Sequence, residues 1–366
     1  MLQIVPPAVC LLIEISRVHD AERAADLRLL ADQAVMARLA PHITRFQLHS
    51  TWCSGPQATV TSDIFIHLCK LQHLRHLELL CGNSLHWLPP QIGQLCHLES
   101  LTLSCPGVHH GLSLLPQPLQ LAQLLALTQL NLHTAQDCME TVCMLPSLRE
   151  LHLGACAGSL PPCSLPAKVV GLSQLSWLHL RGRSLGGSLD SLSKLTALQH
   201  FIIEGVAPGP TFSIANFSQG LAGLTSLNWL AVSGSTLTLP IKALTHLSSL
   251  ICLELEACQF TSFECSGCWQ QLRILSLNDC CLDCMPSNLS VLHALTKLIL
   301  SNQRSQNFQL EAPLRFIECM PFLCELHICQ HRISHSWSYA SIVFLAEADQ
   351  YLDQTQNGIG RKRVSF

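Results

Sequence analysis

Four cysteines in the second half of the chain have the spacing of a zinc site. They form the pattern C-x2-C-x12-C-x2-C, whose pairs are Cys265 with Cys268 and Cys281 with Cys284. Such pairs hold tetrahedral zinc in many small domains. However, residues 272–277 between them have the pattern of a strand, and six extended residues span roughly 20 Å. Because the sulfur ligands of one zinc ion lie within about 4 Å of one another, we predict no zinc site.

A second group of metal-ligating residue types lies near the end of the chain. It consists of Cys324, His327, Cys329, His331 and His335. His327 alternates with apolar Leu326 and Ile328 in a predicted strand, whereas His331 falls in the following turn, so the side chains diverge. The sequence also lacks a phosphate-binding glycine loop, an H-E-x-x-H pair and a nucleophile elbow. We predict no metal, no cofactor, no catalytic residues and no enzymatic activity.

A leucine repeat determines the elements that carry these residues. Residues 272–295 read LRILSLNDCCLDCMPSNLSVLHAL, which fits L-x-x-L-x-L-x-x-(N/C)-x-L-x-x-L-P-x-x-L-x-x-L with Met285 at one leucine position. The pattern begins again at Leu295, 23 residues after Leu272. A segment that repeats with this period is one structural unit of a stack.

Copies of the strand core, apolar-x-x-apolar-x-apolar, run along most of the chain. A weaker copy begins at Ile43, and the others begin at Leu74, Leu98, Leu127, Leu148, Leu175, Leu198, Leu227, Leu250, Leu272, Leu295 and Leu323. With these copies the chain resembles the leucine-rich repeat family over roughly residues 43–345. The segment LPPQIGQL, residues 88–95, is similar to the intracellular plant and Ras-associated type.

The resemblance implies an α/β fold, a leucine-rich repeat solenoid wound as a curved right-handed coil. Each unit would add a short strand to a parallel sheet on the concave face, with loops, 3-10 turns or short helices on the convex face. Residues 43–335 would hold about twelve such units. Steps of 27–29 residues after Leu98, Leu148, Leu198 and Leu295 contain extra proline and glycine. We place their surplus residues in loops.

Residues 1–42, before the repeats, allow two interpretations. Residues 20–39 have apolar positions near helical spacing, which favours a helical cap over the end of the stack. The segments VPPAVCLLIEISRV and DLRLLADQ resemble instead a shortened, degenerate F-box. That resemblance implies a Skp1-like adaptor at the N-terminus and a substrate-recognition subunit of a cullin-RING ubiquitin ligase. At the other end, residues 336–366 are predicted to form a closing helix, at 338–352, and a mobile tail.

Composition argues against several classes of partner. Charged residues make up 12% of the chain, about half the ~25% of typical soluble proteins, and the formal net charge is −3. Without a clustered basic face, we expect no nucleic-acid partner. No apolar run reaches ~18 residues, so we expect no membrane span, and the N-terminus lacks the charge pattern of a secretory signal.

Several cysteines occupy positions set by the repeat. Cys156, Cys258 and Cys280 each lie three residues after the last apolar residue of a strand, where many such repeats carry asparagine. A thiol there donates a weak hydrogen bond to the backbone of the bend, and oxidation would remove that donor. We therefore expect a reduced, cytoplasmic protein, with cytoskeletal or ciliary association as further options.

Strand alternation indicates where a partner would bind. The apolar residues of each strand point into the core, so their neighbours point to the concave surface. Trp177 and Trp229 fall in one column, two strands apart, which predicts a separation of roughly 10 Å. Tryptophan and arginine are enriched at interface hot spots. We expect a monomer that binds a protein partner on this face. The candidate site consists of Glu150, His152, Trp177, His179, Arg181, His200, Glu204, Trp229 and Glu254.

Overall fold

The computed structural model divides the chain into two compact units, unit 1 (Met1–Ala197) and unit 2 (Leu198–Phe366). The residues that the structure describes are 9–15, 40–50, 68–80, 90–104, 122–133, 139–154, 166–182, 190–205, 214–234, 241–259, 263–280, 282, 286–300, 320–327 and 363–365.

In unit 1, every described strand pairs in parallel with the next strand along the chain. The strands are β1 (Val9–Ile15), β2 (Ile43–Ser50), β3 (His76–Leu80), β4 (Ser100–Ser104), β5 (Gln129–His133), β6 (Glu150–Gly154) and β7 (Trp177–Arg181). Parallel neighbours need a crossover connection between them, so each step along the chain must return to the same end of the sheet.

Unit 2 follows the same rule of parallel pairing between successive strands. Its strands are β8 (His200–Glu204), β9 (Trp229–Ser233), β10 (Cys252–Glu256), β11 (Ile274–Asn278), β12 (Lys297–Ile299), β13 (Glu325–His327) and β14 (Arg363–Ser365).

Within the strands, buried residues alternate with partly exposed ones. In β11, Leu275 and Leu277 are fully buried, whereas Ile274, Ser276 and Asn278 are half-buried. The pairing places inward apolar residues, mostly leucines, beside one another from strand to strand, so each unit has a continuous row of buried side chains along its sheet. The strand positions and the register predicted from the repeat are confirmed.

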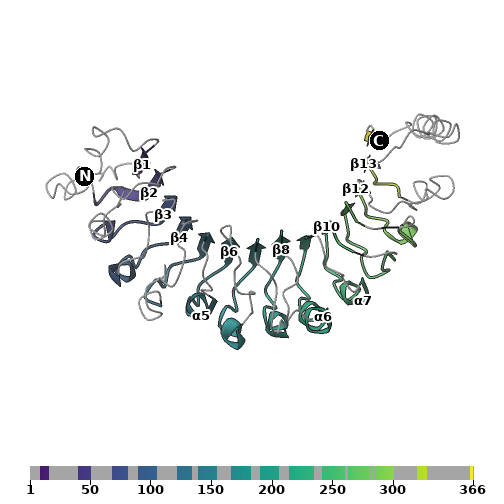
Figure 1. The fold of residues 1–366 in the computed structure, drawn as a ribbon, viewed down its shortest axis with the longest axis horizontal. Coiled ribbons are helices and arrows are strands. Elements are labelled where there is room, and N and C mark those ends of the chain that lie inside the picture. Colours follow the sequence, from purple (N-terminus) through teal and green to yellow (C-terminus); the bar gives the residue numbers. More distant parts are fainter. Residues whose placement is uncertain are drawn as a thin grey trace, which may run out of the picture. The chain divides into compact units, whose positions relative to one another are not determined.

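The return segments contain short helices and 3-10 turns, as the resemblance to leucine-rich repeats implies. In each unit, the strands lie along one side and the helices along the other (Figure 1). The elements are η1 (Pro90–Gln94), α5 (Met139–Val142), η2 (Ala167–Gly171) and η3 (Asp190–Lys194) in unit 1, and α6 (Ile214–Ala222), α7 (Ile241–Leu244) and η4 (Leu289–Val291) in unit 2. No helix in the described parts of the chain has the length and apolar character needed to cross a bilayer.

One long step contains a longer helix than the other described return segments. The step from Leu198 to Leu227 is 29 residues long, and its surplus was predicted to lie in a loop. It contains α6, a helix of nine residues that begins after Pro210 and Phe212 and ends before Leu224. Its buried Leu221 occupies the same core position of the repeat as Leu289, whereas residues 206–213, which contain the extra proline and glycine, lie outside the described residues.

Both ends of the chain contain strands that the sequence analysis did not predict. β1 lies inside residues 1–42 and extends the sheet of unit 1 beside β2, with a register shift between Val9 and Cys10. β14 lies in the predicted mobile tail and pairs with β13. The helices predicted at 20–39 and 338–352 lie outside the described residues.

Cysteine fills the predicted asparagine slot in two described bends of unit 2. The Cys280 thiol donates to the carbonyl oxygens of Leu255 and Asn278, at 3.4 Å each. The Cys258 thiol donates in the same way to Val232 at 3.7 Å and to Glu256 at 3.5 Å. The expected role of these thiols in the bend is confirmed, and Cys156 lies outside the described residues.

Candidate protein-binding surface

All nine residues of the predicted site occupy strand positions that alternate with the buried apolar residues. We call these positions the outward face of each unit. Arg181 is exposed and the other eight are half-buried. Unit 1 carries Glu150 and His152 on β6 with Trp177, His179 and Arg181 on β7, and unit 2 carries His200 and Glu204 on β8, Trp229 on β9 and Glu254 on β10.

The outward face of unit 1 brings three aromatic rings together on β6 and β7. The ring of His152 packs against Trp177 with centroids 6.0 Å apart, and meets His179 edge-on at 5.5 Å. The Nδ1 atoms of the two histidines are 3.3 Å apart. A hydrogen bond between two imidazole nitrogens needs one of them to be unprotonated, so this pair cannot be doubly charged without breaking the contact.

His133 on β5 belongs to the same face, although it was not among the predicted site residues. Its ring lies over Gly154 of the neighbouring strand, where a Cβ atom would overlap the imidazole. Glycine at an outward strand position is the sequence signal for such a close approach. The structure therefore extends the aromatic cluster of unit 1 from β7 to β5.

Burial favours the neutral form of two imidazoles in this cluster, those of His133 and His152. It lowers the pKa of His133, an effect that Arg181 and His179 reinforce. Burial also lowers the pKa of His152, where His179 acts in the same direction and the Glu150 carboxylate opposes it. Desolvation penalises the charged form of a base, so near pH 7 these rings act as uncharged, hydrogen-bonding aromatic groups.

In unit 2, the central pair on the outward face is His200 on β8 and Trp229 on β9. The two residues are direct neighbours across the strands, and their ring centroids lie 6.0 Å apart at 47°. The Trp229 indole N–H is buried and has no acceptor among the described residues. Glu204 and Glu254 lie on the same face. Trp177 and Trp229 belong to different units, so the separation predicted for them stays a prediction.

Comparison with known proteins gives structural matches alone. No family model matches the chain, and no curated protein matches it. A leucine-rich repeat protein of Leptospira interrogans is similar with a TM-score of 0.53 and 17% identity, covering 96% of this chain and 99% of its own. An internalin (InlF) of Listeria monocytogenes is similar with a TM-score of 0.51 and 17% identity, covering 82% of this chain and 77% of its own.

The chain has a leucine-rich repeat fold. In a leucine-rich repeat fold, the core needs only the alternate residues of each strand, so the residues between them are available for other roles. Two tryptophans, each beside a histidine, occupy such positions, while Trp269 fills a core position and donates its indole N–H to the Leu244 carbonyl oxygen at 3.0 Å. Tryptophan thus occupies both core and outward positions in this leucine-rich repeat fold.

The structure describes only some of the cysteines and histidines for which the sequence predicts no metal site. Among the side chains described, no group of three or more histidines, cysteines, aspartates and glutamates is placed to hold a metal ion. Burial raises the pKa of Cys265 to about 12, so this thiol is protonated at neutral pH. Cys281, Cys284 and His331 lie outside the described residues.

Proposed function

We propose that the chain is a non-enzymatic protein-binding module that captures a partner on its outward face. The observation that carries the proposal is the placement of Trp177 and Trp229. Each stands half-buried on a strand whose leucine or valine neighbours already complete the core, and each packs against a histidine ring. Neither indole is needed to fill the interior.

Binding a protein partner gives these indoles a physical role. A tryptophan side chain buries about 150–250 Å² when covered, so the half-exposed parts of these rings offer a partner a large apolar contact area. The Trp229 indole N–H is buried and has no acceptor within the described residues, so no hydrogen bond of this group explains its place on the outward face. Because neighbouring histidines already restrict these rings, little side-chain entropy remains to be lost on binding.

We further propose that the protein works as a monomer in the cytoplasm, with cytoskeletal or ciliary association as options. The support is chemical: the cysteines whose side chains are described are free thiols, and those of Cys258 and Cys280 donate hydrogen bonds inside the bends. Buried donors of this kind are compatible with a reducing compartment. Sedimentation of the purified chain and localisation of a tagged copy in cells would test both statements.

Affinity capture with matched variants tests the main proposal. The full chain is immobilised, and the proteins it retains are compared with those retained by Trp177→Ala, Trp229→Ala and the double variant. We expect each substitution to weaken capture of the partner by about 2 kcal/mol or more, as for interface anchors. Leu125→Ala and Phe322→Ala remove exposed apolar side chains outside the strands and serve as controls. Undiminished capture by the double variant would refute the proposal.

The alternative, a substrate-recognition subunit of a ubiquitin ligase, rests on the F-box resemblance alone. The segment VPPAVCLLIEISRV contains β1, a strand, whereas an F-box is helical, which counts against this alternative. Its test is co-purification of a Skp1-like adaptor. Recovery of the adaptor with the full chain, and its loss after changes in residues 1–40, would favour the alternative over a simple binding module.

A further inference from the structure

The outward face of unit 2 combines apolar and acidic side chains. Its apolar residues include Ile202 on β8, Trp229 on β9 and Ile274 on β11, and all three are half-buried. Glutamates stand beside them on β8 and β10: Glu204, Glu254 and Glu256. Strand spacing places the acidic residues of β8 and β10 about 10 Å apart, with the two glutamates of β10 about 7 Å apart.

Positive charge is scarce on this face. Among the described side chains of β8–β13, Lys297 is the one lysine or arginine, and it forms an ion pair with Glu325 at 2.9 Å. Glu254 contacts the Cys252 thiol at 3.6 Å, and Glu256 accepts a hydrogen bond from the Asn278 side chain at 3.3 Å. Neither glutamate lies within ion-pair distance of a described cationic side chain.

The outward face of unit 1 differs in this respect. There Glu78 accepts a hydrogen bond from Gln47 and Glu150 accepts one from Gln129. Arg181 on β7 lies on the same face, together with His133 on β5 and His152 on β6, whose pKa burial lowers. The acidic, apolar combination is therefore a property of the described face of unit 2, and it predicts a partner of opposite charge.

We infer that the outward face of unit 2 binds a basic protein segment that contains an apolar residue. This inference rests on the proposed function and specifies its partner. Lysine or arginine side chains would pair with Glu254 and Glu256, and a flanking apolar or cationic group would cover the face of Trp229. The same carboxylates repel nucleic-acid phosphates and anionic lipid, so the charge favours a protein segment as the occupant.

Two synthetic peptides test this inference with the full chain. One is a fluorescein-labelled 12-residue peptide with four lysines and two leucines among serines; the other has glutamate in place of each lysine. We expect the lysine peptide to bind, as measured by fluorescence anisotropy, and its affinity to fall as the salt concentration rises because exposed charge pairs are screened. The glutamate peptide should not bind.

Matched variants locate the binding site. Glu254→Gln with Glu256→Gln should weaken binding of the lysine peptide by about tenfold or more, and Trp229→Ala should weaken it as well. Glu264→Gln, an exposed carboxylate outside the described strands that accepts a hydrogen bond from Asn288 at 3.0 Å, should leave binding unchanged. No binding of the lysine peptide, equal binding of both peptides, or equal losses from Glu264→Gln and the double variant would each overturn the inference.

Binding of the captured natural partner to these variants distinguishes failure of the inference from failure of the proposed function. A captured partner that requires Trp229 but binds the Glu254→Gln, Glu256→Gln variant normally would overturn the basic-segment inference and leave the proposed function standing. Capture that is insensitive to both tryptophans and both glutamates would overturn the two together.

Discussion

At the scale of single residues, the outward face of unit 1 is built by rings that lean across strands. His133 lies over Gly154, and His152 contacts both Trp177 and His179. The alternation rule placed the predicted side chains on this face correctly because it depends only on strand periodicity. It could not show the contact of His133 with Gly154, which depends on side-chain direction between neighbouring strands.

The first prediction concerns this close approach. Gly154→Ala should displace the His133 ring toward solvent, because the new methyl group would overlap it. Since burial is the main cause of the lowered pKa of His133, that pKa should rise toward its ordinary value. Titration of the histidine ring protons by NMR would measure the change. Gly267→Ala, whose methyl group meets no neighbouring atom, is the control, and an unchanged His133 titration in Gly154→Ala would contradict the described contact.

The second prediction concerns the thiol in the bend after β11. Cys280→Ala should lower the free energy of unfolding by about 1 kcal/mol, because the carbonyl oxygens of Leu255 and Asn278 lose their donor. Cys280→Asn should be better tolerated, since an amide is a stronger donor than a thiol. Urea unfolding measures both, with exposed Cys268→Ala as the control. Equal stability of the wild type and Cys280→Ala would show that the thiol does not support the bend.

At the scale of elements, the leucine rhythm was sufficient to predict the strands from β2 to β13. The buried leucines of β11 are those assigned from the repeat, and the bends carry cysteine where the pattern calls for asparagine. A fixed repeat lets each strand be located from its neighbours as well as from its own residues.

Elements outside the repeat could not be predicted in this way. β1 has a nearly continuous apolar run, VCLLIEI, which periodicity does not distinguish from a helix, and only the pairing with β2 decides it. β14 has three residues with little strand signal of their own. The helix α6 begins four residues after Pro210, and the repeat pattern alone did not give its bounds.

The third prediction tests the register of the elements. Leu275→Asp should disrupt the packing of unit 2, because it buries an unpaired carboxylate at a fully buried position of β11. Ser276→Lys places a charge one residue along the same strand, on the outward face beside Glu254, and should leave the melting temperature nearly unchanged. Thermal unfolding monitored by circular dichroism compares the two. Similar melting of both variants would contradict the assigned faces.

At the scale of the whole molecule, histidines with lowered pKa make stability depend on pH. Burial lowers the pKa of His76, His133 and His152, all in unit 1. Above an unfolded-state pKa of about 6.5, these groups are neutral in both states and carry no penalty. As the pH falls through that value, the unfolded chain takes up protons that the folded chain resists, so the folded state loses stability.

The fourth prediction follows from this linkage. The free energy of unfolding should be lower at pH 5.5 than at pH 7.5, and a variant with His133→Gln and His152→Gln should show a smaller difference. Urea titrations at the two pH values measure the effect. A pH dependence that is equal in the variant and in the wild type would mean that these two histidines do not contribute to it.

At this scale, the residues of each strand are divided between an inward and an outward face. Alternate residues fill the core, and the residues between them present aromatic and charged groups that the fold itself does not require. The sequence was sufficient to predict which strand positions face outward in each unit, and the role of these residues in binding a partner stays a prediction. It could not identify a partner, because the repeat constrains the inward positions and leaves the outward ones free to vary in chemistry.

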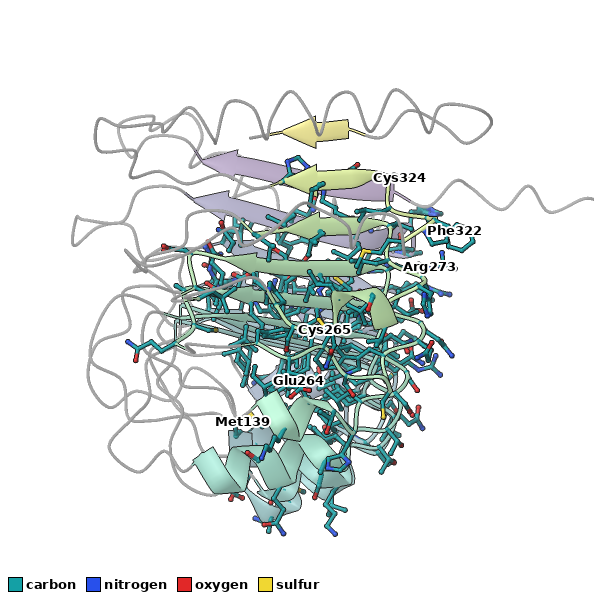
Figure 2. The ribbon with its side chains drawn as sticks, turned by 90° about the vertical axis from the view of Figure 1, so that its right-hand side faces the viewer. Met139, Glu264, Cys265, Arg273, Phe322 and Cys324 are labelled. Atoms are coloured by element: carbon teal, nitrogen blue, oxygen red, sulfur yellow. The ribbon has the colours of Figure 1, made fainter. Side chains whose placement is uncertain are left out.

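The most direct test of partner binding on the outward face is hydroxyl-radical footprinting of the protein with and without its captured partner. If the outward face binds the partner, oxidation of Trp177 or Trp229 should fall in the complex. Oxidation of Phe322, which lies at the edge of the sheet where the strands begin (Figure 2), and of Leu125 should not change. Unchanged oxidation of both tryptophans, with protection of Phe322 or Leu125 instead, would place the binding surface elsewhere and contradict the account.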